Sequence, residues 1–186
     1  FILSCGGSMG AEKINDEMLA LMRDYTSKHP EILHIHATGA IEYEVARAKF
    51  EEYGLAKYEN IQLLEYIYDM PLKMTAADIV VNRAGAMTLS ELALLGKCCV
   101  LIPSPHVTDN HQYKNAKVLA DAGAALLFEE RELSGGILTD EISRLIADES
   151  RRKQMSENIR KFALPDANRA IYDDLMLLAG QKNRRG

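Results

Sequence analysis

Short apolar runs alternate along the chain with longer segments in which apolar residues recur every three or four positions. Most of the short runs are continuously apolar, which is typical of strands that are covered on both faces of a sheet. They predict strands over Phe1–Cys5, Ile32–His36, Ile61–Leu64, Asp78–Asn82, Cys98–Ile102 and Ala124–Phe128. The periodic segments predict helices over Ala11–Thr26, Ile41–Tyr53, Thr88–Leu95 and Gln112–Asp121, and a shorter helix within Tyr68–Ala77 after Pro71.

This alternation indicates βαβ units, and therefore a parallel sheet joined by right-handed crossovers. The chain shows no internal repeat and no linker rich in Gly, Ser or Pro, so we expect one α/β domain with a doubly wound parallel sheet of about six strands. Three helices are predicted to follow the sheet, over Thr139–Asp148, Arg151–Phe162 and Asp166–Ala179. Because Pro165 and Asp166 form a helix-start signal, we expect a domain over residues 1–165 and a C-terminal helix with a basic tail over residues 166–186.

Composition excludes several classes of protein. Of the 186 residues, 26% are charged and 47% are hydrophobic, which is ordinary for a globular domain and argues against disorder. The net charge of −5 argues against nucleic-acid binding, because such proteins present a basic face with interleaved aromatic residues. No apolar run reaches the roughly 18 residues that a membrane-spanning helix needs.

The three cysteines predict no disulfide framework and no zinc site. Cys5, Cys98 and Cys99 are odd in number, two are adjacent, and none has a second ligand at zinc spacing. Each lies in an apolar run, so we expect buried, reduced thiols, as in a cytosolic protein. The chain begins at Phe1, directly in a predicted core strand and without a signal peptide, so we expect it to be a piece of a longer protein.

A parallel sheet places its ligand beyond the carboxyl ends of the strands. The loops there are Gly6–Gly10, Tyr66–Met70, Asn82–Thr88 and Pro103–His111. The glycines of the first loop allow a phosphate or diphosphate to approach the start of a helix, although a tight turn without a ligand remains the alternative. The glycine spacing fits neither the dinucleotide fingerprint nor a Walker loop.

Two further groups of residues have a functional and a structural interpretation. Thr88 and Glu91 fit a capping box, but the Glu91 carboxylate could instead accept hydrogen bonds from a pair of sugar hydroxyls. His111, Gln112 and Asn115 lie at a helix start, where they form either a neutral group that suits a sugar ring or a solvated helix end. No Asp-x-Asp motif accompanies them, which argues against a metal-bridged sugar nucleotide.

His34 and His36 lie two apart on a predicted strand and therefore share one face. Metal ligation is the less favoured interpretation, and we expect buried or edge histidines.

Four motifs in this order resemble the C-terminal half of the MurG family, the bacterial N-acetylglucosaminyltransferases that make lipid II from lipid I. They are Gly6-Gly7-Ser8-x-Gly10-Ala11, Tyr66-Ile67-x-Asp69-Met70, Arg83-Ala84-Gly85-Ala86-x-Thr88-x-Ser90-Glu91 and Asn110-His111-Gln112-x-x-Asn115-Ala116. The resemblance covers nearly the whole chain. Each motif alone is weak, but their order makes the resemblance specific.

The resemblance implies the GT-B architecture, in which two Rossmann-like domains enclose the active site. The C-terminal half binds UDP-GlcNAc, here over residues 1–165, and the N-terminal half supplies the lipid acceptor site and the proposed base. It implies that Ser8 contacts the diphosphate or the nearby sugar, that the backbone of Ile67 meets the uracil, and that Glu91 binds the ribose. It also implies that Ala86, Met87, Thr88, Leu89 and Ser90 line the phosphates, and that Gln112, with His111 and Asn115 as weaker candidates, binds the GlcNAc hydroxyls.

By the same resemblance we expect the donor half of an inverting transferase of peptidoglycan synthesis, and so of cell-wall growth, shape and division. It implies no metal, no cofactor and no catalytic residue in this half, so the fragment alone should bind donor weakly and transfer nothing. The family lies peripherally on the cytoplasmic face of the bacterial inner membrane, mainly through the missing half, which also meets lipid I. The alternatives are another GT-B enzyme, such as a glycolipid glycosyltransferase or a UDP-GlcNAc 2-epimerase, and a stand-alone non-catalytic partner subunit of a sugar transferase.

Overall fold

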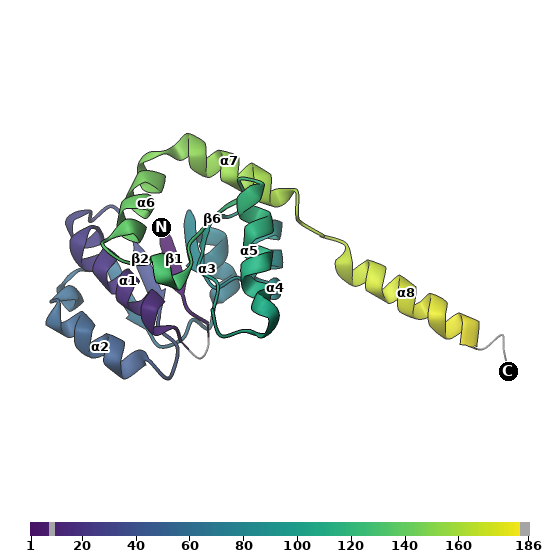
Figure 1. Cartoon of the computed structure of the whole chain (residues 1–186), viewed down its shortest axis with the longest axis horizontal. Helices are drawn as coiled ribbons and strands as arrows, with labels where there is room; N and C mark the ends of the chain where they lie inside the picture. The colour runs from purple at the N-terminus through teal and green to yellow at the C-terminus, as the bar shows by residue number, and fades with distance from the viewer. Residues whose placement is uncertain (8–9, 183–186) are drawn as a thin grey trace.

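Six parallel strands form the centre of the molecule, which we describe from a computed structural model for residues 1–7 and 10–182 (Figure 1). Their order across the sheet is β3-β2-β1-β4-β5-β6, and every neighbouring pair is parallel. This confirms the predicted α/β fold. The strands are β1 (Ile2–Cys5), β2 (His34–Ala37), β3 (Ile61–Leu64), β4 (Ile79–Asn82), β5 (Cys98–Leu101) and β6 (Ala125–Leu127).

Helices connect the strands and close the chain, largely where the periodicity predicts them. They are α1 (Glu12–Asp24), α2 (Tyr43–Glu52), α3 (Met70–Ala76), α4 (Ala86–Leu95), α5 (His111–Asp121), α6 (Ile137–Ala147), α7 (Glu149–Arg160) and α8 (Ala167–Lys182). Pro71 lies within the first turn of α3 instead of preceding the helix, because a proline there removes no needed N–H donor. The start of α4 at Ala86, two residues earlier than predicted, matters for the site below.

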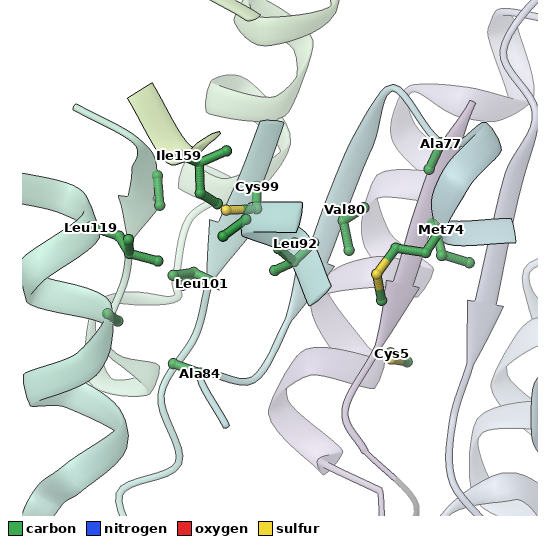
Figure 2. Close-up of a cluster of buried hydrophobic side chains, with 14 of the residues drawn as sticks. Cys5, Met74, Ala77, Val80, Ala84, Leu92, Cys99, Leu101, Leu119 and Ile159 are labelled. Carbon is green, nitrogen blue, oxygen red and sulfur yellow. The ribbon is translucent and has the colours of Figure 1, made fainter. Parts of the chain in front are cut away.

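Helices cover both faces of the sheet, which explains why the strands are continuously apolar. Leu3, Val80 and Cys99 point to one face, and their alternating neighbours Ile2 and Ile79 point to the other. On the first face (Figure 2), the strands pack against residues of α3, α4, α5 and α7, including Met74, Leu92, Leu119 and Ile159. On the second, they pack against residues of α1 and α6, including Ile14, Met18, Ile142 and Leu145. Truncating such a residue to Ala costs about 2–5 kcal/mol.

The three thiols are buried and free, as predicted. Burial raises the pKa of all three above the usual value for a thiol, and that of Cys98 to about 11. A thiolate is the reactive form of cysteine, so these residues act as packing groups within the sheet.

The last helix, α8, extends away from the sheet (Figure 1). Its large apolar residues, among them Ile171, Leu175 and Leu178, are exposed to solvent. The predicted boundary at residue 165 falls in the segment between α7 and α8, and Asn183–Gly186 of the basic tail lie outside the described residues. Among the residues that the structure describes, no helix combines the length and the apolar character needed to cross a membrane.

The two strand histidines belong to a buried polar network. The Ser4 hydroxyl lies 2.9 Å from Nε2 of His34 and 2.9 Å from Nδ1 of His36. Nε2 of His36 lies 2.9 Å from Oδ1 of Asn15 on α1, and the Asn15 amide nitrogen donates to the Thr38 carbonyl. Burial lowers the pKa of His36 from 6.5 to about 4 and that of His34 well below 6.5. Both rings are therefore neutral hydrogen-bonding groups that tie α1 to β1 and β2.

This network predicts a loss of stability in mild acid. As the pH falls below 6.5, His36 becomes protonated in the unfolded chain. In the folded chain it stays neutral until the pH approaches about 4. The free energy of unfolding should therefore fall by about 2 kcal/mol between pH 7 and pH 5 because of His36 alone. Urea denaturation at both pH values measures this loss.

The variant His36→Gln should be less stable than the parent at pH 7 but should lose less stability between pH 7 and pH 5. His29→Gln is the matched control, since the His29 side chain is 38% exposed and lies outside the network. An equal pH dependence for His36→Gln and the parent chain would contradict this assignment.

Candidate functional site

The order of the strands opens a crevice at one edge of the sheet. The chain leaves β1 toward β2 and β3 on one side, whereas β4, β5 and β6 follow on the other side. In doubly wound sheets ligands bind at this reversal, beyond the carboxyl ends of the two central strands. The loops after β1 and β4 are therefore the first place to look for a site.

Gly10, in the loop after β1, lies backbone to backbone against Gly39 in the loop after β2. Gly10 and Gly39 have φ values of 89° and 82°, a region that L-residues with a side chain rarely adopt. A Cβ added to Gly39 would lie 2.2 Å from the Gly10 nitrogen and 2.9 Å from the Gly7 carbonyl oxygen. Glycine is thus required by contact as well as by conformation. Ser8, the residue predicted to touch a diphosphate, lies outside the described residues.

The loop after β4 presents an uncapped helix start. Gly85 is the N-cap residue of α4, and no side chain caps it. Within the described residues, the backbone N–H groups of Ala86, Met87 and Thr88 have no acceptor. Such free donors carry the positive end of the helix dipole and favour an anion.

The capping-box interpretation of Thr88 and Glu91 is wrong. The helix starts at Ala86, so Thr88 is its third residue and Glu91 lies in the second turn, too far along to reach back to the cap. The Glu91 carboxylate is exposed and has no hydrogen-bond or ion-pair partner among residues 1–7 and 10–182. It is therefore available to a ligand.

Thr88 and Glu91 line a cavity of about 180 Å³ between the carboxyl ends of the central strands, which we call the switch-point cavity. Ile67 is buried there, and neither its N–H nor its carbonyl forms a hydrogen bond within the described part of the chain. The cavity is lined by Cys5, Gly7, Ala37, Glu65, Tyr66, Ile67, Met70, Met74, Asn82, Thr88 and Glu91. Sequence reasoning singled out neither Glu65 nor Asn82, although each stands at a strand end, where such residues are expected.

The structure divides the predicted stretch from Ala86 to Glu91 between two sides of α4. Ala86, Leu89 and Ser90 line a separate groove of about 260 Å³ between α4 and α5, together with Asn115. The Ser90 hydroxyl donates to the Ala86 carbonyl at 3.0 Å. Met87 is 80% exposed. With 3.6 residues per turn, a single helix cannot aim all these side chains at one cavity.

The three polar residues of α5 also separate. His111 is the first residue of the helix, and its Nδ1–H donates to the Thr108 carbonyl at 2.9 Å. Gln112 turns toward the loop after β5, where its Oε1 accepts the Ser104 N–H at 2.9 Å. Asn115, one turn further, faces the groove beside α4. Of the two side-chain amides, that of Gln112 is therefore the one that hydrogen-bonds to the loop after β5 within the described residues.

A third cavity, of about 450 Å³, lies beside Gln112 between the loops after β5 and β6. It is lined by Pro103, Ser104, Pro105, His106, Asn110, Tyr113, Glu129, Glu130 and Arg131. Sequence reasoning missed Glu129–Arg131 because the loop after β6 contains no Gly-rich motif. Its position after a strand was the available signal.

These groups suit binding more than covalent chemistry. Free N–H donors match an anion, and a carboxylate and an amide match hydroxyl groups. Among the described residues, no cluster of three or more His, Cys, Asp or Glu side chains is arranged to hold a metal ion. Cys5, the thiol in the switch-point cavity, is kept protonated because burial raises its pKa.

Comparison with known proteins points to one family. Residues 1–171 match the glycosyltransferase family 28 C-terminal domain. The UDP-N-acetylglucosamine--N-acetylmuramyl-(pentapeptide) pyrophosphoryl-undecaprenol N-acetylglucosamine transferase of Acetivibrio thermocellus is 42% identical over 168 residues, which are 90% of this chain and 44% of that protein. The crystal structure of Acinetobacter baumannii MurG superposes with a TM-score of 0.77 at 29% identity, covering 92% of this chain and 48% of that one.

A more distant structure shares the fold alone. UDP-GlcNAc 2-epimerase from Neisseria meningitidis, bound to UDP-GlcNAc, has a TM-score of 0.62 at 17% identity and covers 94% of this chain and 43% of that one. The chain spans about half the length of the curated relatives it matches.

The backbone contact between Gly10 and Gly39 predicts a specific sensitivity to substitution. Gly39→Ala should destabilise the fold by at least about 2 kcal/mol more than Gly54→Ala. Both glycines have positive φ, but a Cβ on Gly54 meets nothing within 4 Å, so the difference isolates the contact between the loops. Urea denaturation of the two variants measures it. Equal costs would show that the loops can separate freely.

Proposed function

Because the chain belongs to glycosyltransferase family 28, as its C-terminal domain, we propose that it is the donor-binding half of an inverting enzyme that transfers GlcNAc from UDP-GlcNAc to lipid I, giving lipid II in peptidoglycan synthesis. The observation that carries this proposal is the unpartnered Glu91 carboxylate, which lies in the switch-point cavity beside the uncapped start of α4. A nucleoside diphosphate needs an acceptor for its ribose hydroxyls next to donors for its phosphates. The 42% identity to a named UDP-GlcNAc transferase supports the choice of donor.

In this proposal backbone groups hold the diphosphate. The N–H groups of Ala86, Met87 and Thr88 donate to phosphate oxygens, and Ser8, which follows β1 in the sequence, is assigned to the same diphosphate or the nearby sugar. Each favourable helix end contributes about 0.3–1 kcal/mol to anion binding. The same donors stabilise the charge that develops on UDP as it leaves, which is how this half assists the reaction.

Side chains and one loop bind the rest of the donor. The free N–H and carbonyl of Ile67 pair with the uracil edge, and the Glu91 carboxylate accepts from the ribose hydroxyls. Gln112 binds the hydroxyls of GlcNAc, with His111 and Asn115 as its neighbours on α5. Leu89 and Ser90 are not assigned a direct contact with the phosphates, since their side chains face the groove toward α5 and the Leu89 N–H already donates to the Gly85 carbonyl.

The remaining parts of the reaction belong to the other half of a protein about twice this length, as the relatives are. We place there the base that deprotonates the acceptor hydroxyl, the lipid I site and most of the contact with the membrane. By the same proposal, the enzyme is peripheral to the cytoplasmic face of the bacterial inner membrane. Residues 1–165 form the donor domain, and residues 166–186 a helix and tail outside it.

Calorimetric titration of the chain with UDP-GlcNAc tests the donor site. UDP and UDP-GlcNAc should bind, whereas NAD should not. Glu91→Gln should weaken UDP binding roughly tenfold to a hundredfold, because it removes a charged acceptor of hydrogen bonds.

Glu52→Gln is the control, since Glu52 is an exposed carboxylate on α2, away from the cavity. UDP binding that is equally strong in Glu91→Gln and in the parent chain would overturn the assignment of Glu91. Binding of NAD in preference to UDP would overturn the proposed donor.

A further inference from the structure

Arg83 joins the three loops on one side of the crevice. It directly follows β4, and its Nη1 donates to the carbonyls of Ile102 at 3.1 Å and Pro103 at 3.0 Å, just beyond β5. Its Nη2 pairs with the carboxylate of Glu130, beyond β6. The side chains of Arg83 and Glu130 are only 14% and 22% exposed, so solvent screens this pair less than the ion pairs on the surface.

The guanidinium lies just beyond the end of the hydrogen-bond ladder between β4 and β5. The ladder between β4 and β5 ends with the Ile102 N–H bonding to the Asn82 carbonyl. The next two carbonyls, of Ile102 and Pro103, lie beyond the ladder and accept hydrogen bonds from Arg83 instead. The planar guanidinium reaches two carbonyls from one nitrogen and a carboxylate from another, whereas a lysine would have to gather all three acceptors around a single nitrogen.

The turn that Arg83 holds is the turn that orients Gln112. Ser104 follows Pro103 directly, and its N–H donates to Oε1 of Gln112 at 2.9 Å. Because a backbone N–H can only donate, the amide oxygen of Gln112 must face it and the amide nitrogen must point away. Within the described residues, that nitrogen has no acceptor, so its two N–H groups are free for the hydroxyl oxygens of a ligand.

We propose that Arg83 and Glu130 form a clamp that positions Gln112 through the Pro103–Ser104 turn and so sets the selectivity of the site for the configuration of the sugar. This proposal rests on the proposed donor function. Arg83 and Glu130 are positioning residues, since their polar atoms are engaged with each other and with backbone carbonyls. A firmly held amide discriminates between hydroxyl orientations, whereas a freely rotating one adapts to either.

The binding test compares UDP-GlcNAc with UDP-GalNAc, which differ only in the orientation of one hydroxyl, and with UDP, which lacks the sugar. Arg83→Lys should reduce the preference for UDP-GlcNAc over UDP-GalNAc by about tenfold and leave the affinity for UDP within twofold. In a Gln112→Ala background, Arg83→Lys should have no further effect on the preference, because the clamp acts through that amide. Arg47→Lys, which alters an exposed Arg47–Glu51 pair on α2, is the control.

A second readout needs no ligand. Hydrogen exchange of the Ser104 N–H, followed by NMR, should be at least about tenfold faster in Arg83→Lys than in the parent chain and unchanged in Arg47→Lys. The Gln112 side-chain amide resonances should shift in the first variant only. Glu130→Gln, which keeps the shape but removes the charge, should give a smaller change in the same direction.

The outcomes separate the two proposals. If the parent chain binds no uridine nucleotide, the donor function fails, and the exchange of Ser104 still decides whether the clamp exists. If Ser104 exchanges equally slowly with and without Arg83, the clamp is overturned. If the clamp is confirmed by exchange but Arg83→Lys keeps the full preference for UDP-GlcNAc, its role in selectivity is overturned.

Discussion

The rest of the structure depends on the pairing of β1 with both β2 and β4. In this register Ile2 lies opposite His34 on one side and Ile79 on the other, so the strand order reverses at the centre of the sheet. The loops after β1 and β4 must then diverge to opposite faces, and a crevice opens between them. The start of α4, the glycine loop and the switch-point cavity are all consequences of that reversal. Burial of β1 on both faces, with apolar residues or neutral histidines around it, holds the reversal in place.

The groups assigned to the donor differ in how they are held. The N–H donors of α4 are part of the backbone, so their direction follows from the helix and from Gly85. The Glu91 side chain has no partner among the described residues and can rotate, whereas the Gln112 side chain is restrained through Ser104 and the clamp of Arg83 and Glu130. A firm site for an anion at the start of α4 and a positioned amide on α5 suit a ligand with a charged centre and a neutral, hydroxyl-rich end.

The predicted positions of the strands held because each depends on a single segment. The strands lie within about two residues of their predicted bounds, since a buried strand shows itself by its own apolar run. The predicted capping box was wrong because its pattern specifies only the spacing of Thr88 and Glu91. The same spacing occurs inside a helix, and here the N-cap is Gly85, three residues before Thr88. The cluster of His111, Gln112 and Asn115 separated because one turn of α5 faces both a loop and a neighbouring helix.

The sequence by itself determined the alternation of strands and helices, the loops where polar groups collect and the likeness to a glycosyltransferase family. Only the tertiary structure decided which of those polar groups line the same cavity and which form hydrogen bonds or ion pairs with each other. Glu91 meets Ile67, and Arg83 meets Glu130 across 47 residues of sequence, through strand pairings that no local pattern encodes. Periodicity reports whether a residue faces a core. The direction of a side chain at a strand end depends on which loops lie beside it, and those are set by the order of strands in the sheet.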